Sequence, residues 1–158
     1  MTTVTTLPDF NQQLAKVANE YYYRSLRQNI IMVKKSQKMN GQKMGPVCLG
    51  YKDGAKRGEV DIEPKAAKLV KEIYNRYIFG QSQAEIVRWL NENHLDKLNS
   101  HGKQFYPSTV RRILTNTLYT GWCYGPNDEL IRSMVYEPII DDDTFLKAKN
   151  IRFIRQKK

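Results

Sequence analysis

A long interval without glycine or proline is the strongest constraint on what this chain can fold into. From Asp9 to Met39 neither residue occurs, so nothing in the interval breaks a helix. The apolar residues at helical spacing are Leu14, Val17, Ala18, Tyr21, Tyr22, Leu26, Ile30 and Val33. The pattern predicts one helix of about 30 residues, whereas the mean helix length in globular proteins is about 11–12 residues. The Thr-rich residues before it are expected to form a flexible start.

The apolar stripe of this helix needs a surface to pack against. Left uncovered, such a stripe is an exposed apolar patch, and its spacing is too irregular for a heptad coiled coil. We expect a monomer or a weak homodimer, with any self-association made through residues 9–39.

Glycines punctuate the next segment, residues 40–58, which includes Asn40-Gly41 and Gly45-Pro46. This composition predicts a linker that leads into two extended pieces, Val47–Lys52 and Glu59–Ile62. The predicted organisation is therefore a flexible start with a long linker helix over residues 1–43, and a second domain over residues 44–158.

Three helices are predicted after the linker. Pro64 marks the first turn of one, and Gly80 marks its end. The sequence Ser82-Gln83-Ala84-Glu85 is a capping box that opens the next helix. Pro107 starts a short third helix, in which Val110, Ile113 and Leu114 form the apolar face.

The C-terminal part changes from helical to alternating periodicity. Residues Tyr119–Tyr124 and Leu130–Tyr136 flank a Gly-Pro-Asn-Asp turn, which predicts a hairpin. Asp141–Asp143 then place carboxylates at the start of a last helix, where the dipole favours them over a metal-binding role. The predicted fold class is mainly α with a small antiparallel β element (α+β).

The distribution of charge points to a polyanionic partner. The chain has 26 Lys and Arg against 16 Asp and Glu, a net charge of +10. No acidic residue lies between Glu20 and Asp53, none between Asp96 and Asp128, and none after Asp143. A surface that follows phosphates excludes carboxylates in this way.

Composition also excludes several classes of protein. No apolar run is long enough for a membrane span, and no signal segment opens the chain. Cys48 and Cys123 lie far apart and the chain has only two histidines, so we expect no structural zinc, no other metal and no cofactor. We expect a soluble, cytoplasmic protein.

The third short helix is the best candidate for base recognition. Three helices with a glycine turn between the first two suggest a helix-turn-helix arrangement, in which the start of the last helix enters the major groove. The loop before that helix is longer than in the simple motif, and Arg111 and Arg112 could also be ordinary exposed helix residues.

We further expect the glycine-rich arm, residues 40–52, to follow the DNA backbone or minor groove. The predicted DNA-binding residues are Lys34, Lys35, Lys38, Lys43, Lys52, Lys103, Ser108, Thr109, Arg111 and Arg112.

A series of short motifs runs in order through residues 44–153. They are Gly50-Tyr51, Glu63 with Ala66, Tyr77-x-x-Gly80-x-Ser82, Ile86-x-x-x-Leu90-Asn91, Gly102, Phe105, Val110-Arg111-Arg112-Ile113-Leu114-x-Asn116, Tyr119-x-Gly121 and Glu137-Pro138-Ile139-Ile140 with Phe145. Together they resemble the recombinase domain of the large serine recombinases. Residues 9–43 are similar to the helix that joins that family's catalytic domain to its DNA-binding region.

The resemblance implies binding to double-stranded DNA at half of a recombination (attachment) site, within a bacterial or phage-encoded recombinase. Two positions depart from the family pattern. The aromatic pair before the third helix is Phe105-Tyr106, which lacks a side-chain cap, and Thr117 stands where a proline is common.

The catalytic and zinc-ribbon domains of the family have no counterpart in this sequence. We therefore expect no enzymatic activity from the chain itself, and interpret Ser25 as a surface serine rather than a nucleophile. The alternatives are a stand-alone helix-turn-helix transcriptional regulator and an RNA-binding protein. The expected sheet segments are short for an RNA-stacking platform.

Overall fold

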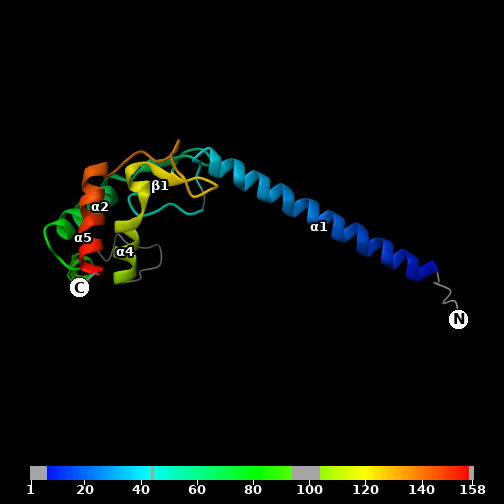
Figure 1. The fold of residues 1–158 in the computed structure, drawn as a ribbon, viewed down its shortest axis with the longest axis horizontal. Helices are drawn as coiled ribbons and strands as arrows, with labels where there is room; N and C mark the ends of the chain where they lie inside the picture. Colours follow the sequence, from blue (N-terminus) through cyan, green and yellow to red (C-terminus); the bar gives the residue numbers. More distant parts are fainter. Residues whose placement is uncertain (1–6, 44, 94–103, 157–158) are drawn as a thin grey trace. The chain divides into compact units, whose positions relative to one another are not determined.

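The computed structural model describes residues 7–43, 45–93 and 104–156. The chain separates into two compact units, with the boundary between Gln37 and Lys38. Helix α1 spans Leu7–Met39 without interruption (Figure 1), which confirms the predicted long helix and extends it by two residues at its start. Its apolar side chains, Leu14, Val17 and Ile30 among them, are exposed.

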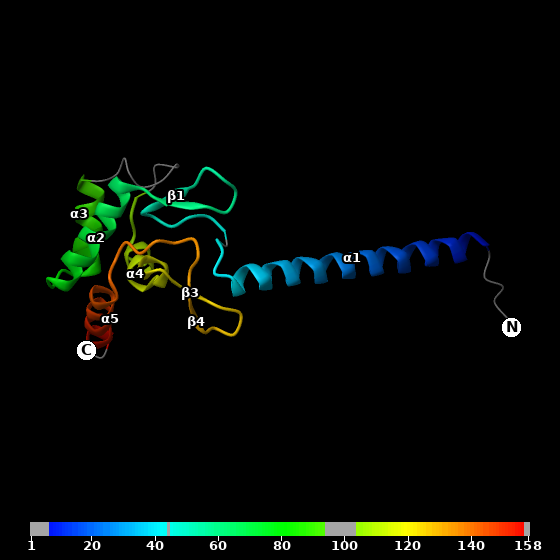
Figure 2. The same ribbon diagram turned by 90° about the horizontal axis from the view of Figure 1, so that it is seen from above.

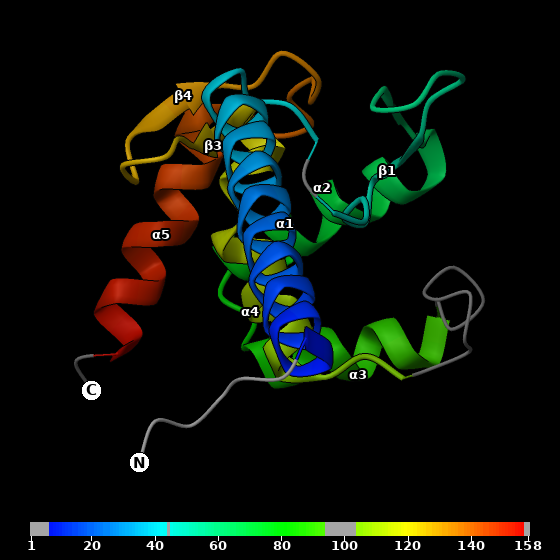
Figure 3. The ribbon, with the colours of Figure 1, turned by 90° about the vertical axis from the view of Figure 1, so that its right-hand side faces the viewer.

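The second unit is mainly helical with two separate antiparallel hairpins (Figures 2 and 3), as the fold class predicted. Its first half contains strands β1 (Tyr51–Asp53) and β2 (Val60–Ile62), then helices α2 (Pro64–Ile78), α3 (Gln83–Asn93) and α4 (Pro107–Thr115). Its second half contains the 3-10 helix η2 (Thr117–Thr120), strands β3 (Trp122–Tyr124) and β4 (Leu130–Arg132), and helix α5 (Asp142–Gln156). Tyr51 pairs with Ile62 in the first hairpin, and Trp122 with Arg132 in the second.

The strands of the second hairpin are shorter than the sequence predicted, and local side-chain hydrogen bonds explain why. Tyr119 and Thr120 were expected in a strand, but the Asn116 side chain accepts a hydrogen bond from the Leu118 amide and starts a 3-10 turn. At the other strand, the Ser133 hydroxyl accepts from the backbone amides of Val135 and Tyr136. Such side-chain bonds compete with the strand ladder and end it early.

Buried tyrosines dominate the core of this unit. Tyr51, Tyr74 and Tyr119 are almost fully buried, and the hydroxyl of each donates to a backbone carbonyl. The acceptors are Glu137, at 2.6 Å, Ile113, at 2.9 Å, and Leu49, at 2.8 Å. Burial raises the pKa of all three phenols, so they stay neutral and keep donating at neutral pH.

Helix α2 ends in a hydrogen-bonded motif that α5 completes. Gly80 adopts a φ of +104°, its amide donates to the Tyr77 carbonyl, and the Gln81 amide donates to the Arg76 carbonyl. This is the Schellman pattern predicted by the glycine. The guanidinium of Arg155 in α5 donates to the Gly80 and Gln81 carbonyls at 2.7 and 2.9 Å, which fastens α5 to this end of α2.

The capping box predicted for α3 is present in both directions. The Glu85 amide donates to the Ser82 hydroxyl at 3.2 Å, and the Ser82 amide donates to the Glu85 carboxylate at 2.7 Å. Hydrogen bonding of the Glu85 carboxylate to the backbone amide and side chain of Ser82 lowers the pKa of Glu85. Helix α4 has no such cap: Tyr106 precedes it without a side-chain bond, as the sequence predicted.

Asp141 caps α5 and makes the stability of this helix depend on pH. Its carboxylate accepts from the amide of Thr144 at 2.7 Å and from the hydroxyl of the same residue at 2.9 Å. These two bonds lower the pKa of Asp141. A depressed folded-state pKa stabilises the fold above the unfolded value, about 3.9, and this stabilisation is lost as pH falls through the folded pKa.

We therefore expect Asp141→Asn to destabilise the chain at neutral pH and to match the wild type in acid. Asparagine still accepts the capping bonds, so the variant removes the charge and retains the cap. Urea unfolding at a series of pH values measures the difference in unfolding free energy between the two proteins. A difference that stays constant from neutral to acid pH would contradict this role of the carboxylate.

Candidate nucleic-acid interface

The outward face of α4 carries the arginines that the sequence singled out. Val110, Ile113 and Leu114 are buried, and they fix the orientation of the helix. Ser108, Arg111 and Arg112 have exposed side chains. Residues three and four apart share one face of a helix, so these three side chains form one exposed, positively charged surface.

Two residues of α4 differ from the prediction. Thr109 is only half exposed, because it lies between the buried and the exposed face. Thr115 was not among the predicted residues, although it is exposed and follows Ser108 by seven residues, two helical turns. That spacing was a signal the sequence already contained. We call Ser108, Arg111, Arg112 and Thr115 the α4 outward face.

Hydrogen bonds from neighbouring helices hold the C-terminal end of α4. The Tyr74 hydroxyl of α2 donates to the Ile113 carbonyl at 2.9 Å, and the Arg152 guanidinium of α5 donates to the Leu114 carbonyl at 3.3 Å. Both carbonyls belong to the last turn of α4, where the usual partner four residues further along the helix is missing. The Ile113 carbonyl also accepts from the amide of the cap residue Asn116 at 3.4 Å. The α4 outward face is thereby presented from a rigid support.

The side chain of Asn91 holds the segment that enters α4. Its amide donates to the Phe105 carbonyl at 3.2 Å, and its carbonyl oxygen accepts from the Phe105 amide at 2.8 Å. This pair of bonds ties the end of α3 to the residue two positions before Pro107. Asn91 belongs to one of the short motifs of the sequence, but its positioning role was not predicted.

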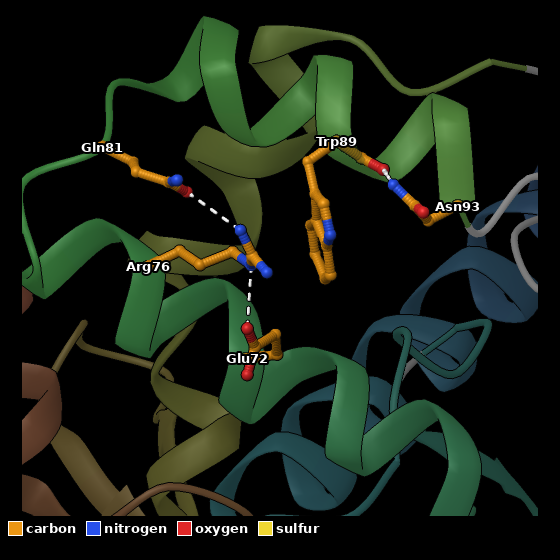
Figure 4. A network of polar contacts seen from close by, with 5 residues as sticks. All are labelled: Glu72, Arg76, Gln81, Trp89 and Asn93. Atoms are coloured by element: carbon orange, nitrogen blue, oxygen red, sulfur yellow. Dashed lines mark hydrogen bonds and ion pairs between the residues drawn. The ribbon is translucent and has the colours of Figure 1, made fainter.

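A cation–aromatic contact fixes α3 on α2 (Figure 4). The Arg76 guanidinium of α2 lies 3.8 Å from the centre of the Trp89 ring of α3. Its Nε pairs with the Glu72 carboxylate at 2.8 Å, and Nη1 donates to the Gln81 side chain at 3.5 Å. Partial burial strengthens contacts of this type. The helices α2, α3 and α4 are thus linked by specific polar contacts as well as by the core.

The start of the glycine-rich arm packs against β4. Gly41 has a φ of +59°, and a Cβ at this position would lie 2.9 Å from the Arg132 carbonyl oxygen. The Ser133 hydroxyl donates to the Gly41 carbonyl at 3.0 Å. Glycine is required here because backbone approaches backbone too closely for a side chain.

A groove connects this part of the arm with the end of α4. It encloses about 270 Å³, and its lining includes Lys38, Gln42, Thr115, Thr117 and Tyr124. In Figure 2, α4 lies between the α2–α3 pair and the β3–β4 hairpin. The start of the arm and the last residue of α4 therefore line the same groove.

The structure gives two predicted lysines acidic partners. Lys43 forms an ion pair with Asp53 of β1, and the Lys38 ammonium lies 3.9 Å from the Asp128 carboxylate in the β3–β4 turn. Sequence windows without acidic residues had suggested unopposed charge at both positions. Folding brings the carboxylates of the two hairpins to these lysines.

The remaining predicted residues lie in both units, and one of them lies outside the described residues. Lys34 and Lys35 have exposed side chains on α1. Lys52 is exposed on β1, opposite Asp61 of β2. Lys103 lies outside the described residues. These positions therefore remain predictions that the structure does not link to α4.

The two cysteines add no negative charge to this basic surface at neutral pH, because burial raises the pKa of both thiols. Burial raises the pKa of Cys48, although the Tyr119 hydroxyl and the positive charge of Arg112 act in the opposite direction. Burial also raises the pKa of Cys123.

Among the described residues, no three His, Cys, Asp or Glu side chains gather as a metal site would require. None of the helices in the described ranges combines the length and apolarity of a membrane span. The exposed arginines of the α4 outward face, Arg111 and Arg112, suit the binding of an anion.

Two solved structures share the fold of this chain. One is described as the crystal structure of an LSR–DNA complex, with a TM-score of 0.64 and 22% identity over 82% of this chain and 39% of that chain. The other concerns the sequence requirements of the Listeria innocua prophage attP site, with a TM-score of 0.65 and 20% identity over 79% of this chain and 51% of that chain. The chain thus spans between about two fifths and half of the length of these proteins.

A search of curated protein sequences gave no match. A family model described as Recombinase matches residues 64–154, from the start of α2 to the last turns of α5. The match includes α3 and α4 and extends over more than half of the chain. It confirms the resemblance to a recombinase domain that the motifs indicated. The chain belongs to the Recombinase family.

Proposed function

We propose that the chain is the DNA-binding part of a site-specific recombinase and binds duplex DNA at half of an attachment site. In this proposal residues 44–158 form the DNA-binding domain, and residues 1–43 form the start and the helix that links it to the catalytic domain. DNA strand exchange belongs to that catalytic domain in the parent protein. Family membership and the fold shared with an LSR–DNA complex support this assignment.

The observation that carries the proposal is the α4 outward face. Arg111 and Arg112 project from a short helix that is held rigidly at both ends, and α4 contains no acidic residue. An exposed helix of this kind fits the major groove, where arginine makes bidentate contacts with guanine. Ser108, in the first turn, suits a phosphate contact. The adjoining arm extends the same surface along the DNA.

Selection from a pool of random duplexes tests the proposal. We expect the wild-type chain to enrich a short motif, because base contacts from α4 favour some sequences over others. A specific DNA-binding protein typically prefers its site by about 10³–10⁷ over other DNA. If the retained duplexes have no common motif after repeated selection, the chain does not recognise a site.

A further inference from the structure

The two carboxylates that pair with Lys38 and Lys43 come from turns and strands outside the basic segments. Asp53 lies on β1, and Asp128 lies in the turn between β3 and β4. The pairing therefore depends on the folded unit and has no counterpart in the local sequence. The Lys43 side chain is 16% exposed in this pair, while that of Asp53 is 69% exposed. The carboxylate is thus the exposed side of the pair, and a phosphate reaches the Lys43 ammonium only when Asp53 moves away from it.

The second pair is more open and is held by backbone geometry. Asp128 has a φ of +60°, and its amide donates to the Gly125 carbonyl at 3.2 Å. The turn thus places the Asp128 carboxylate beside Lys38, with 91% of the side chain exposed. An exposed ion pair at 3.9 Å is weak and exchanges readily with ions from solution.

A DNA phosphate carries the same charge as these carboxylates and binds lysine through the same kind of contact. While Asp53 occupies Lys43, this lysine can bind a phosphate only by giving up the carboxylate. The binding free energy gained from such an exchange is smaller than the free energy gained when a phosphate binds a lysine that has no acidic partner. The freed carboxylate also takes up a cation, which offsets the counterion that the DNA releases.

We propose that Asp53 is an internal competitor for DNA phosphate, which occupies Lys43 and weakens the binding of the arm to any duplex. Asp128 has the same effect on Lys38, to a smaller extent. The inference rests on the proposed function, because it takes duplex DNA as the polyanion. It identifies acidic residues of a basic surface as determinants of its affinity and of its response to salt.

The test uses the full 158-residue chain and duplex DNA of mixed sequence, with binding measured by fluorescence anisotropy over a series of salt concentrations. We expect Asp53→Asn to tighten binding about three- to tenfold at low salt, and to steepen the salt dependence by about one contact, a slope change of about 0.9. Asp128→Asn should give a smaller change of the same sign. Asparagine tolerates the left-handed backbone at that position, so this second variant keeps the turn.

Two controls separate competition from a general change in charge. Asp142→Asn makes the same change at an exposed position at the start of α5, outside both hairpins, and should alter affinity and salt slope much less. In a Lys43→Gln background, Asp53→Asn should have no effect beyond that of Asp142→Asn. Thermal unfolding of each variant shows that the unit is still folded.

The inference is overturned if Asp53→Asn binds no more tightly than Asp142→Asn, or if its gain persists without Lys43. Weaker binding by Asp53→Asn would also overturn it, since the carboxylate would then position Lys43 for DNA. In these cases the wild type still binds duplex, and the proposed function stands. If the wild type binds no duplex at all, both proposals fail together.

Discussion

Replacing Gly50 with alanine should destabilise the globular unit by about 2–5 kcal/mol. Gly50 has a φ of +99°, and an added Cβ would lie 2.9 Å from Ile139 and 3.2 Å from Val70 in the core. The backbone strain costs about 1–2 kcal/mol, and overpacking a core typically costs about 1–3 kcal/mol. The Gly50 carbonyl also accepts from the Glu63 amide just before α2, so a shift here disturbs the start of that helix. Urea unfolding measures the loss.

Gly45→Ala is the matched control for this prediction. Gly45 has a φ of +83°, but nothing lies within 4 Å of a Cβ at that position. It should lose only the backbone contribution, about 1–2 kcal/mol. Equal losses in the two variants would show that the contacts with Ile139 and Val70 do not constrain Gly50.

Removing either arginine of the α4 outward face should change which DNA sequence the chain prefers. We expect Arg111→Ala or Arg112→Ala to cost about 1–3 kcal/mol in binding the selected duplex and to relax the preference at one base pair. The loss should be confined to one base pair, because a bidentate arginine contact distinguishes guanine from the other bases. Competition between the selected duplex and its single-base variants measures both quantities.

A charge-matched control lies in the β1–β2 loop, where Arg57 is exposed. Arg57→Ala removes the same charge from a position outside α4. It should shift affinity for all duplexes alike, if at all, and leave the order of preference among them unchanged. If neither Arg111→Ala nor Arg112→Ala alters that order, α4 is not the recognition helix.

The helix ends could be predicted because each is marked by local chemistry. Pro64 and Pro107 occupy first turns, Gly80 takes the left-handed conformation, and Ser82 with Glu85 forms both bonds of a capping box. None of these features needs a distant residue to form. The division of α4 into a buried and an exposed face follows equally from spacing within nine residues.

What the sequence could not predict depends on contacts between remote segments. The Lys43–Asp53 pair and the Lys38–Asp128 pair arise when the two hairpins pack beside residues 38–43. A charge count along the chain does not register such contacts. The same applies to Asn91, which binds the backbone of Phe105 fourteen positions away. The short strands were overestimated because alternation does not report the side-chain bonds of Asn116 and Ser133 that end them.

Interference by guanine methylation tests most directly whether α4 enters the major groove. Methylation of guanine N7 blocks the major-groove acceptor that arginine binds. We predict that methylation at one or a few guanines of the selected duplex prevents binding by the wild-type chain. Methylation at one of these guanines should no longer weaken binding by Arg111→Ala or by Arg112→Ala. Unimpaired wild-type binding to duplexes methylated at every guanine would contradict a major-groove contact by α4.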